Sequence, residues 1–231
     1  MSRPEAGRWV GHRVGHRAGY WADYGPEEFA AQFGVSRETC AQFVRYEEAL
    51  RRWQRRINLV GPSTLNDVWG RHFADSAQLA AHLRADARSL VDLGSGAGFP
   101  GLVLKLLRPD LEVHLIEADK RKAAFLTATA AMLSIDVAVV AARIEEVARG
   151  QARPRADIVT ARALAPLAAL LELASGWSVD NPQFLLLKGQ NVESELISTA
   201  KCWNMTVRQI DSVTHPDGCL LSIERIARVK I

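Results

Sequence analysis

Three glycines at alternate positions, Gly94, Gly96 and Gly98, form the segment of the sequence that is best suited to bind a small ligand. They follow a short apolar stretch at Leu90 to Leu93 and precede a segment with helical spacing. Because glycine has no Cβ atom, such a turn bends sharply and approaches a ligand closely, while the amides of the next helix face that ligand. The sequence therefore predicts a ligand-binding turn between a strand and a helix.

The spacing of these glycines indicates the kind of ligand. A dinucleotide-binding turn reads G-x-G-x-x-G, whereas this chain reads G-x-G-x-G after an acid at Asp92. A second acid, Glu117, ends a strand-like stretch about twenty residues later, which is the spacing of a carboxylate that binds ribose hydroxyls. Glu117 suits NAD and S-adenosylmethionine (SAM) alike. The glycine spacing decides between them and predicts SAM, with Asp92 and the three glycines in the cofactor site.

The elements that must position this site follow an alternating pattern. Strands are predicted near residues 90–93, 113–117, 137–141, 157–161, 183–188, 206–211 and 219–226, and helices at 101–107, 120–133, 144–148, 166–174 and 192–202. Alternation predicts a mostly parallel sheet with helices on both faces and ligands at the carboxyl ends of the strands. The last two strands are joined by a loop too short for a crossover helix, so they should form a hairpin with one antiparallel strand. The expected fold is α/β, with a Rossmann-like, mostly parallel seven-stranded sheet.

A helical region is predicted before the first strand. Phe29 and Phe33 have helical spacing, and Ser36 is suited to cap a longer helix that ends at the break Gly61-Pro62-Ser63. The apolar side of that helix comprises Phe43, Tyr46, Leu50, Trp53 and Ile57. We therefore expect a flexible basic tail at residues 1–25, a helical extension at 26–85 and a SAM-binding domain at 86–231.

Length, charge and cysteine content limit the remaining classes of protein. A length of 231 residues suits one α/β domain with a modest extension, and the formal net charge of +3 allows an anionic partner without requiring one. Cys40, Cys202 and Cys219 form no C-x-x-C pair, so neither a disulfide framework nor a metal site is expected. No apolar run reaches the ~18 residues of a membrane helix. These features predict a cytoplasmic protein without a membrane segment.

Five patches along the chain carry a resemblance to a known family. They are Arg71-His72-Phe73-Ala74-Asp75-Ser76, the run from Asp92 to Gly101, Arg143-Ile144-Glu145-Glu146, Ala161-Arg162-Ala163 and Leu187-Lys188-Gly189-Gln190. In this order they resemble the small-subunit ribosomal RNA guanine-N7 methyltransferases, also called glucose-inhibited division protein B or RsmG. The resemblance spans roughly Asn58 to Ile226. The phrase Gly98-Phe99-Pro100-Gly101 is its most distinctive part.

The resemblance implies a fold, an activity and a set of site residues. The implied fold is that of a Rossmann-like class I SAM-dependent methyltransferase. The activity is transfer of a methyl group from SAM to N7 of a guanosine in 16S rRNA, which in the family is guanosine 527 of the 530 loop. The implied cofactor contacts are Gly94, Phe99, Ile144, Glu145 and Arg162, with Glu117 on the ribose. Arg162 and Lys188 are implied to lie beside the methyl group and the RNA, as the catalytic candidates. The implied partner is 16S rRNA or the small ribosomal subunit, and a monomer is expected.

The residue types themselves limit which methyl acceptors the enzyme could use. A cytosine-C5 enzyme needs a nucleophilic cysteine, usually after a proline, and none of the three cysteines follows one. Amino-group methylation usually shows Asn/Asp-Pro-Pro-aromatic after the fourth strand, where this chain reads Thr160-Ala161-Arg162-Ala163. Guanine N7 is already a lone-pair nucleophile, so alignment can supply much of the catalysis. Arg162 and Lys188 would then hold phosphate or the O6 side of the base.

Basic residues before the sheet are candidates for RNA contacts. We expect Arg51, Arg52, Arg55, Arg56 and Arg71 to bind phosphate groups. Two other readings stay open from the sequence, namely a SAM-dependent small-molecule methyltransferase and a non-catalytic RNA-binding protein that retains SAM. A nucleotide-dependent oxidoreductase is disfavoured by the glycine spacing.

Overall fold

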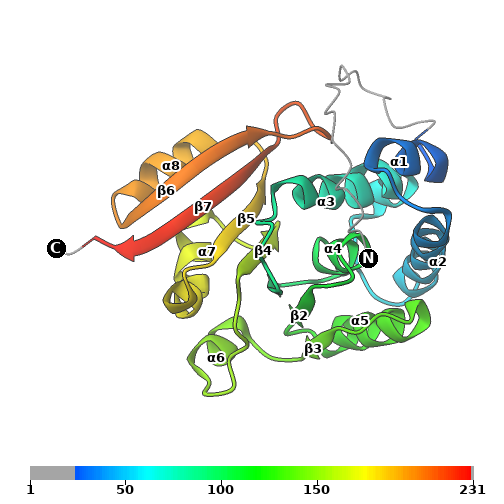
Figure 1. Ribbon diagram of the computed structural model, residues 1–231, viewed down its shortest axis with the longest axis horizontal. Coiled ribbons are helices and arrows are strands. Elements are labelled where there is room, and N and C mark those ends of the chain that lie inside the picture. The colour runs from blue at the N-terminus through cyan, green and yellow to red at the C-terminus, as the bar shows by residue number, and fades with distance from the viewer. Residues whose placement is uncertain (1–23, 230–231) are drawn as a thin grey trace, which may run out of the picture.

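One sheet organises the computed structural model, which describes residues 24–229 (Figure 1). Its seven strands in this range lie in the order β3-β2-β1-β4-β5-β7-β6. β7 is antiparallel to both β5 and β6, and the other neighbouring strands are parallel. The strand bounds are β1 Ser89–Leu93, β2 Glu112–Ile116, β3 Ala138–Val140, β4 Ile158–Arg162, β5 Gln183–Lys188, β6 Trp203–Asp211 and β7 Cys219–Arg228. The predicted fold class and the C-terminal hairpin are both confirmed.

Helices cover both faces of the sheet (Figure 1). On one face α4 (Gly101–Leu107) and α5 (Lys120–Leu133) pack in an apolar cluster with the N-terminal helices. On the other face a second cluster includes residues of α6 (Ile144–Arg149), α7 (Leu167–Ala174) and the 3-10 helix η4 (Ser175–Asp180), with α8 (Val192–Ala200) packed against it. The strand order reverses between β1 and β4, so the carboxyl ends of these strands border the place where such sheets bind ligands.

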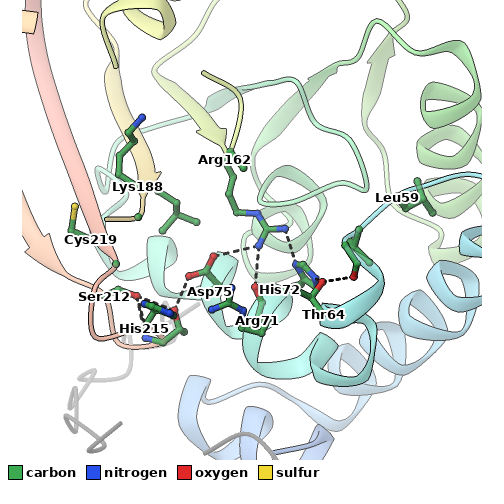
Figure 2. Close-up of a pocket in the computed structure, with 17 residues that line it drawn as sticks. Leu59, Thr64, Arg71, His72, Asp75, Arg162, Lys188, Ser212, His215 and Cys219 are labelled. Atoms are coloured by element: carbon green, nitrogen blue, oxygen red, sulfur yellow. Dashed lines mark hydrogen bonds and ion pairs between the residues drawn. The ribbon is translucent and has the colours of Figure 1, made fainter. Parts of the chain in front are cut away.

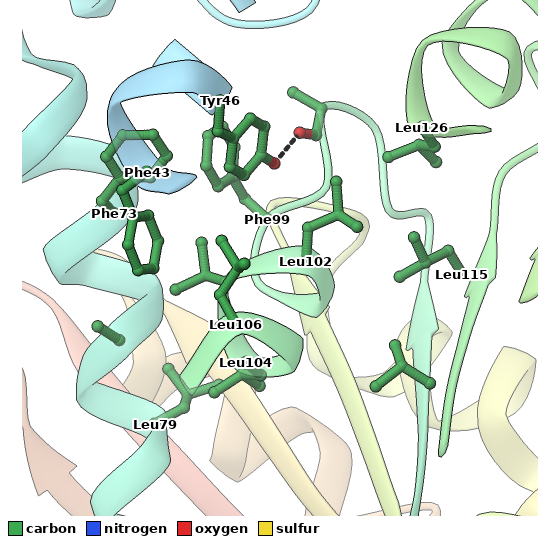
Figure 3. Packing of buried hydrophobic residues seen from close by; sticks show 14 of the residues in the cluster. Phe43, Tyr46, Phe73, Leu79, Phe99, Leu102, Leu104, Leu106, Leu115 and Leu126 are labelled. Atoms are coloured by element: carbon green, nitrogen blue, oxygen red, sulfur yellow. Dashed lines mark hydrogen bonds between the residues drawn. The ribbon is translucent and has the colours of Figure 1, made fainter. Parts of the chain in front are cut away.

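The N-terminal helices share one hydrophobic core with the sheet. They are α1 (Pro26–Phe33), α2 (Arg37–Gln54), η1 (Pro62–Asp67), η2 (Trp69–Ala74), α3 (Asp75–Ala77) and η3 (Gln78–His82). Their aromatic rings meet edge to face, with centroids 4.8 Å apart for Phe29 and Phe43 and 5.1 Å apart for Phe43 and Phe73. Tyr46 then stacks on Phe99 of the glycine-rich turn, at 5.6 Å (Figure 3). The helical extension therefore packs directly on the predicted cofactor turn.

The ends of α2 show where local sequence signals succeed and fail. Ser36 caps the helix as predicted, because its Oγ accepts a hydrogen bond from the Thr39 amide. The predicted break at Gly61 is wrong, since α2 ends at Gln54. The Gln54 side chain accepts hydrogen bonds from the amides of Leu59 and Val60 and so stabilises a turn in place of further helix.

Part of the prediction for the N-terminus lies outside the described residues. Residues 1–23, most of the predicted basic tail, are not among those described, nor are 230–231. Within residues 24–229, no helix is both long and apolar enough to cross a membrane.

Candidate active site

A cavity of about 360 Å³ lies beside the glycine-rich turn, at the carboxyl ends of the strands. This volume falls within the ~300–1,000 Å³ range of small-molecule sites. Its walls come from the turn, the end of β2, the start of α6 and the segment after β4. The lining residues are Gly94, Gly96, Ile116, Glu117, Ala118, Lys122, Arg143, Ile144, Glu145, Arg162, Ala163, Leu164 and Leu173.

The glycines of the turn have two different roles. Gly94 has φ +65° and faces the cavity, and a Cβ there would lie 2.7 Å from the Leu164 side chain. Gly98 has φ +88° and lies behind the turn, where a Cβ would overlap Tyr46 and Leu102. The structure therefore places Gly94 and Gly96 at the cavity surface and Gly98 in its support, although all three were predicted as cofactor residues.

Glu117 connects the turn to the wall formed by β2. Glu117 is 8% exposed, and its carboxylate accepts hydrogen bonds from the amides of Gly96 and Asp119, each at 2.8 Å. These bonds hold the carboxylate at the cavity, and its remaining lone pairs can accept the hydroxyls of a ribose. The cradle of glycines and this fixed acid both fit an adenosyl cofactor.

Asp92 lies beneath the turn and is not among the residues that line the cavity, so its role as a cofactor residue stays a prediction. Its side chain is fully buried, accepting hydrogen bonds from the Gly101 amide at 3.2 Å and from Thr160 Oγ1 at 2.8 Å. Burial raises the pKa of Asp92 to about 6, against the opposing effect of these hydrogen bonds. Asp92 thus joins β1, β4 and the start of α4.

A second cavity, of about 480 Å³, adjoins the first and is assembled from three distant parts of the chain (Figure 2). These parts are residues 59–75, the ends of β4 and β5, and the loop between β6 and β7. Arg162 and Ala163 line both cavities. A group bound in the second cavity would therefore meet a cofactor at Arg162.

Arg162 is held at this boundary by three acceptors. Its Nη1 donates to the Arg71 carbonyl at 3.1 Å and to Asp75 Oδ2 at 3.3 Å, and its Nη2 donates to His72 Nδ1 at 2.8 Å (Figure 2). The guanidinium carbon lies 4.9 Å from the centroid of the Phe99 ring, a cation–π contact. The side chain is 17% exposed, so it is both accessible and fixed in direction.

Phe99 acts in this arrangement as a support. Its ring stacks on Tyr46 on one side and on His72 on the other, where the centroids are 5.0 Å apart and the planes differ by 15°. Only 4% of Phe99 is exposed, and the residue is absent from the lining of the 360 Å³ cavity. The structure thus connects Phe99 to Arg162 and His72, and its predicted contact with the cofactor stays a prediction.

Lys188 is directed differently from Arg162. Its ammonium forms an ion pair with Glu195 at 2.6 Å and donates to the Ala165 carbonyl at 3.1 Å. Glu195 also accepts from the Leu167 amide at 2.7 Å. In Figure 2 the Lys188 side chain points away from the Arg162 cluster. Lys188 therefore holds the loop between β4 and α7 while it lines the second cavity.

The predicted RNA-contacting arginines are only partly brought together. Arg71 is exposed and lines the second cavity. Arg51 pairs with Glu47 at 2.7 Å, and Arg52, Arg55 and Arg56 are exposed at the end of α2. The chain passes from this end directly to Leu59, which lines the cavity. The arginines at the end of α2 therefore stand beside the cavity, outside its walls.

Several polar residues of the site were missed in the sequence. Asp75 Oδ1 accepts from Thr214 Oγ1 at 2.7 Å and so joins α3 to the loop between β6 and β7. His72 is buried between Arg162 and Thr64, and burial together with Arg162 and Arg71 lowers the pKa of its ring to about 3. The available signal was the run Arg71 to Ser76, which places polar residues within an otherwise apolar helical stretch. Among residues 24–229, no cluster of His, Cys, Asp and Glu could hold a metal ion.

Comparison with known proteins agrees with this geometry. The family model described as GidB, rRNA small subunit methyltransferase G, matches residues 39–218. The ribosomal RNA small subunit methyltransferase G of Paramagnetospirillum magneticum is 48% identical over 88% of this chain and 97% of its own length. The protein of the same name from Rhodospirillum centenum is 50% identical over 87% of this chain and 90% of its own.

A solved structure shares the fold at low sequence identity. The crystal structure of cofactor-bound Rv0187 from MTB matches with a TM-score of 0.55 and 13% identity, over 87% of this chain and 98% of that one. The resemblance seen in the five sequence patches is thus confirmed by the family model and by close relatives. The chain belongs to the rRNA small subunit methyltransferase G family and is a SAM-dependent methyltransferase.

Proposed function

We propose that this cytoplasmic enzyme transfers the methyl group of SAM to N7 of a guanosine in 16S rRNA, at the family position guanosine 527 of the 530 loop. The observation that carries the proposal is the place of Arg162, which lies between a cavity suited to SAM and a second cavity open to a larger ligand. When bound, SAM supplies an electrophilic methyl group on a sulfonium. The small ribosomal subunit or its rRNA is the proposed partner.

The residues that would hold SAM are those of the first cavity. Gly94 and Gly96 would leave room for the ligand, Glu117 would accept the ribose hydroxyls, and Ile144 and Glu145 would border the adenine. Asp92, Gly98 and Phe99 support this surface from behind.

The second cavity favours a nucleophile that needs no activation. Cys219 lines it, but burial raises the pKa of the thiol, which disfavours a cysteine nucleophile of the cytosine-C5 kind. The Nδ1 atom of His72 is occupied by Arg162, so this ring is not available as a general base. Guanine N7 has an in-plane lone pair and loses no proton before attack, which matches a site that works by alignment.

Arg162 and Lys188 are the proposed catalytic residues. Three of the five N–H groups of Arg162 donate within residues 24–229, and the other two can donate to guanine O6 or to a phosphate. Lys188 uses two N–H groups on Glu195 and Ala165, which leaves the third for the RNA. The Asp75 carboxylate beside Arg162 offsets the positive charge of a methylated purine.

The direct test is transfer of radiolabelled methyl groups from SAM to small subunits from a strain that lacks the family's enzyme. Label should enter these subunits and map, by reduction and aniline cleavage, to N7 of one guanine. Subunits that already carry the modification and free nucleosides serve as controls. SAM binding without label in any RNA would refute the proposal in favour of a small-molecule or non-catalytic role.

The exposed arginines at the end of α2 make a separate prediction about RNA affinity. Arg55 and Arg56 are proposed to bind two phosphates, and each bound phosphate releases counterions from the RNA. The double variant Arg55→Ala and Arg56→Ala should therefore lower the slope of log K against log salt by about 1.5, measured by filter binding to a 16S rRNA fragment.

A matched control for this experiment removes two arginines at the opposite edge of the sheet. Arg88 and Arg155 are exposed and precede β1 and β4, away from the carboxyl ends of the strands. The double variant Arg88→Ala and Arg155→Ala should bind RNA with the wild-type slope. Equal slopes for the two double variants would remove Arg55 and Arg56 from the interface.

A further inference from the structure

A chain of hydrogen bonds runs from Arg162 to the backbone at Gly61. Arg162 Nη2 lies 2.8 Å from His72 Nδ1, and His72 Nε2 lies 2.8 Å from Thr64 Oγ1. Thr64 Oγ1 donates in turn to the Gly61 carbonyl at 2.8 Å. These contacts are visible in Figure 2, where Thr64 lies on the side of His72 away from Arg162.

The donors and acceptors in this series of hydrogen bonds allow only one direction for each bond. A guanidinium nitrogen can only donate, so His72 Nδ1 must accept from Arg162 and carries no proton. The proton of the neutral ring is then on Nε2, which donates to Thr64 Oγ1. The Thr64 hydroxyl accepts this bond because its own proton is directed to the Gly61 carbonyl. One tautomer of His72 is therefore selected.

The surroundings keep His72 neutral and its ring plane fixed. Burial and the nearby charges of Arg162 and Arg71 lower the pKa of His72 to about 3, and Asp75 is the carboxylate paired with Arg162. His72 is 7% exposed, and its ring stacks on Phe99 with nearly parallel planes. With charge and ring plane both set, the position of the proton is the remaining variable. Arg162 favours the Nε2–H tautomer by donating to Nδ1, and within residues 24–229 Thr64 is the group hydrogen-bonded to Nε2.

We propose that Thr64 is a positioning residue that holds His72 in the Nε2–H tautomer, so that Nδ1 stays free to accept the guanidinium of Arg162. Without the threonine oxygen, the Nδ1–H tautomer would place an N–H group against an N–H group of Arg162. The guanidinium would then lose one of its three acceptors and turn away from the boundary between the two cavities. The effect on methyl transfer rests on the proposed function of Arg162, whereas the effect on the tautomer does not.

The test replaces Thr64 with valine, which keeps the shape of the side chain and removes its oxygen. In the full-length protein with ¹⁵N-labelled histidine, NMR distinguishes the two tautomers by the shifts of the ring nitrogens. Wild-type His72 should be the Nε2–H tautomer, and Thr64→Val should contain a large fraction of Nδ1–H. The kcat of methyl transfer should fall about 10-fold, which corresponds to loss of one hydrogen bond, with little change in SAM affinity.

Two variants make the result specific. Thr64→Ser retains a hydroxyl and should restore both the tautomer and kcat. Thr127 lies on α5, where its hydroxyl donates to the Ala123 carbonyl, and Thr127→Val should leave both measurements unchanged. His72→Asn places an amide oxygen near the position of Nδ1, so adding Thr64→Val to this variant should cause no further loss of kcat.

Each result separates the two proposals. An unchanged tautomer in Thr64→Val overturns the positioning role, whether or not kcat falls. A changed tautomer with an unchanged kcat also overturns it, because Arg162 would then be insensitive to His72. A changed tautomer in a protein whose wild type methylates no RNA supports the selection by Thr64 and refutes the proposed function.

Discussion

Replacing Arg162 with lysine is expected to lower the kcat of methyl transfer to the small subunit about 100-fold, with a smaller change in SAM affinity. The guanidinium is a planar fork that donates at once to the Arg71 carbonyl, Asp75 and His72. An ammonium keeps the positive charge, but it cannot form these three bonds with the same directions or stack in the same way on Phe99. Its charge would therefore be misplaced relative to the reacting base.

The chain contains a matched control for this substitution. Arg153 forms a two-point hydrogen bond with Asp180 and lies 5.8 Å from the centroid of Trp177, and it is 17% exposed like Arg162. Neither Arg153 nor Asp180 is among the residues that line the two cavities. Arg153→Lys should lower stability to a similar extent as Arg162→Lys while retaining kcat. Equal kcat values for the two variants would show that Arg162 has a structural role only.

The second large effect is expected for Gly98→Ala, which should lower the free energy of unfolding by about 3 kcal/mol. The residue has φ +88°, which costs an L side chain about 1–2 kcal/mol. The added Cβ would also lie 2.5 Å from Leu102 Cδ1 and overlap the Tyr46 hydroxyl, which donates to the Ala97 carbonyl. For a chain of this length we expect the melting temperature to fall by about 6–12 °C, measured by calorimetry.

Gly34 separates backbone strain from crowding in this prediction. It has φ +63° at the end of α1, and no atom of residues 24–229 would lie within 4 Å of a Cβ at this position. Gly34→Ala should therefore lose only the cost of the backbone conformation, about 1 kcal/mol, and retain wild-type SAM binding. Gly98→Ala should additionally weaken SAM binding, since it displaces the turn from Tyr46. Equal losses in the two variants would contradict the packing described at Gly98.

Local sequence signals were sufficient for most elements of this protein. The predicted helices 101–107 and 120–133 agree with α4 and α5, and each strand was found within a few residues of its observed bounds. Apolar runs, helical spacing and the glycine-rich turn all act between neighbours in the chain, so they can be interpreted without a partner segment. The place of Glu117 beside the turn could be predicted for the same reason, because one βαβ unit determines its distance from the turn.

The predictions fail where side-chain hydrogen bonds, not the local pattern of residue types, determine the backbone conformation. Gln54 ends α2 through its own hydrogen bonds to residues ahead of it. In the π-helical segment η2, the Asp75 amide donates to the Gly70 carbonyl five residues earlier, and the Arg71 carbonyl accepts from Arg162. Neither arrangement produces a periodic pattern of apolar residues from which it could be predicted.

The sequence by itself therefore determined the fold class, the cofactor turn and the identity of Arg162 and Lys188 as residues at the ends of β4 and β5. Only the tertiary structure decided what these residues contact. Arg162 contacts His72 and Asp75, which lie about ninety residues earlier in the chain. Asp75 contacts Thr214, which is even more distant in sequence. Such contacts depend on the strand order and on the packing of the N-terminal helices against the sheet, and their hydrogen-bond directions depend on atoms that no linear pattern brings together.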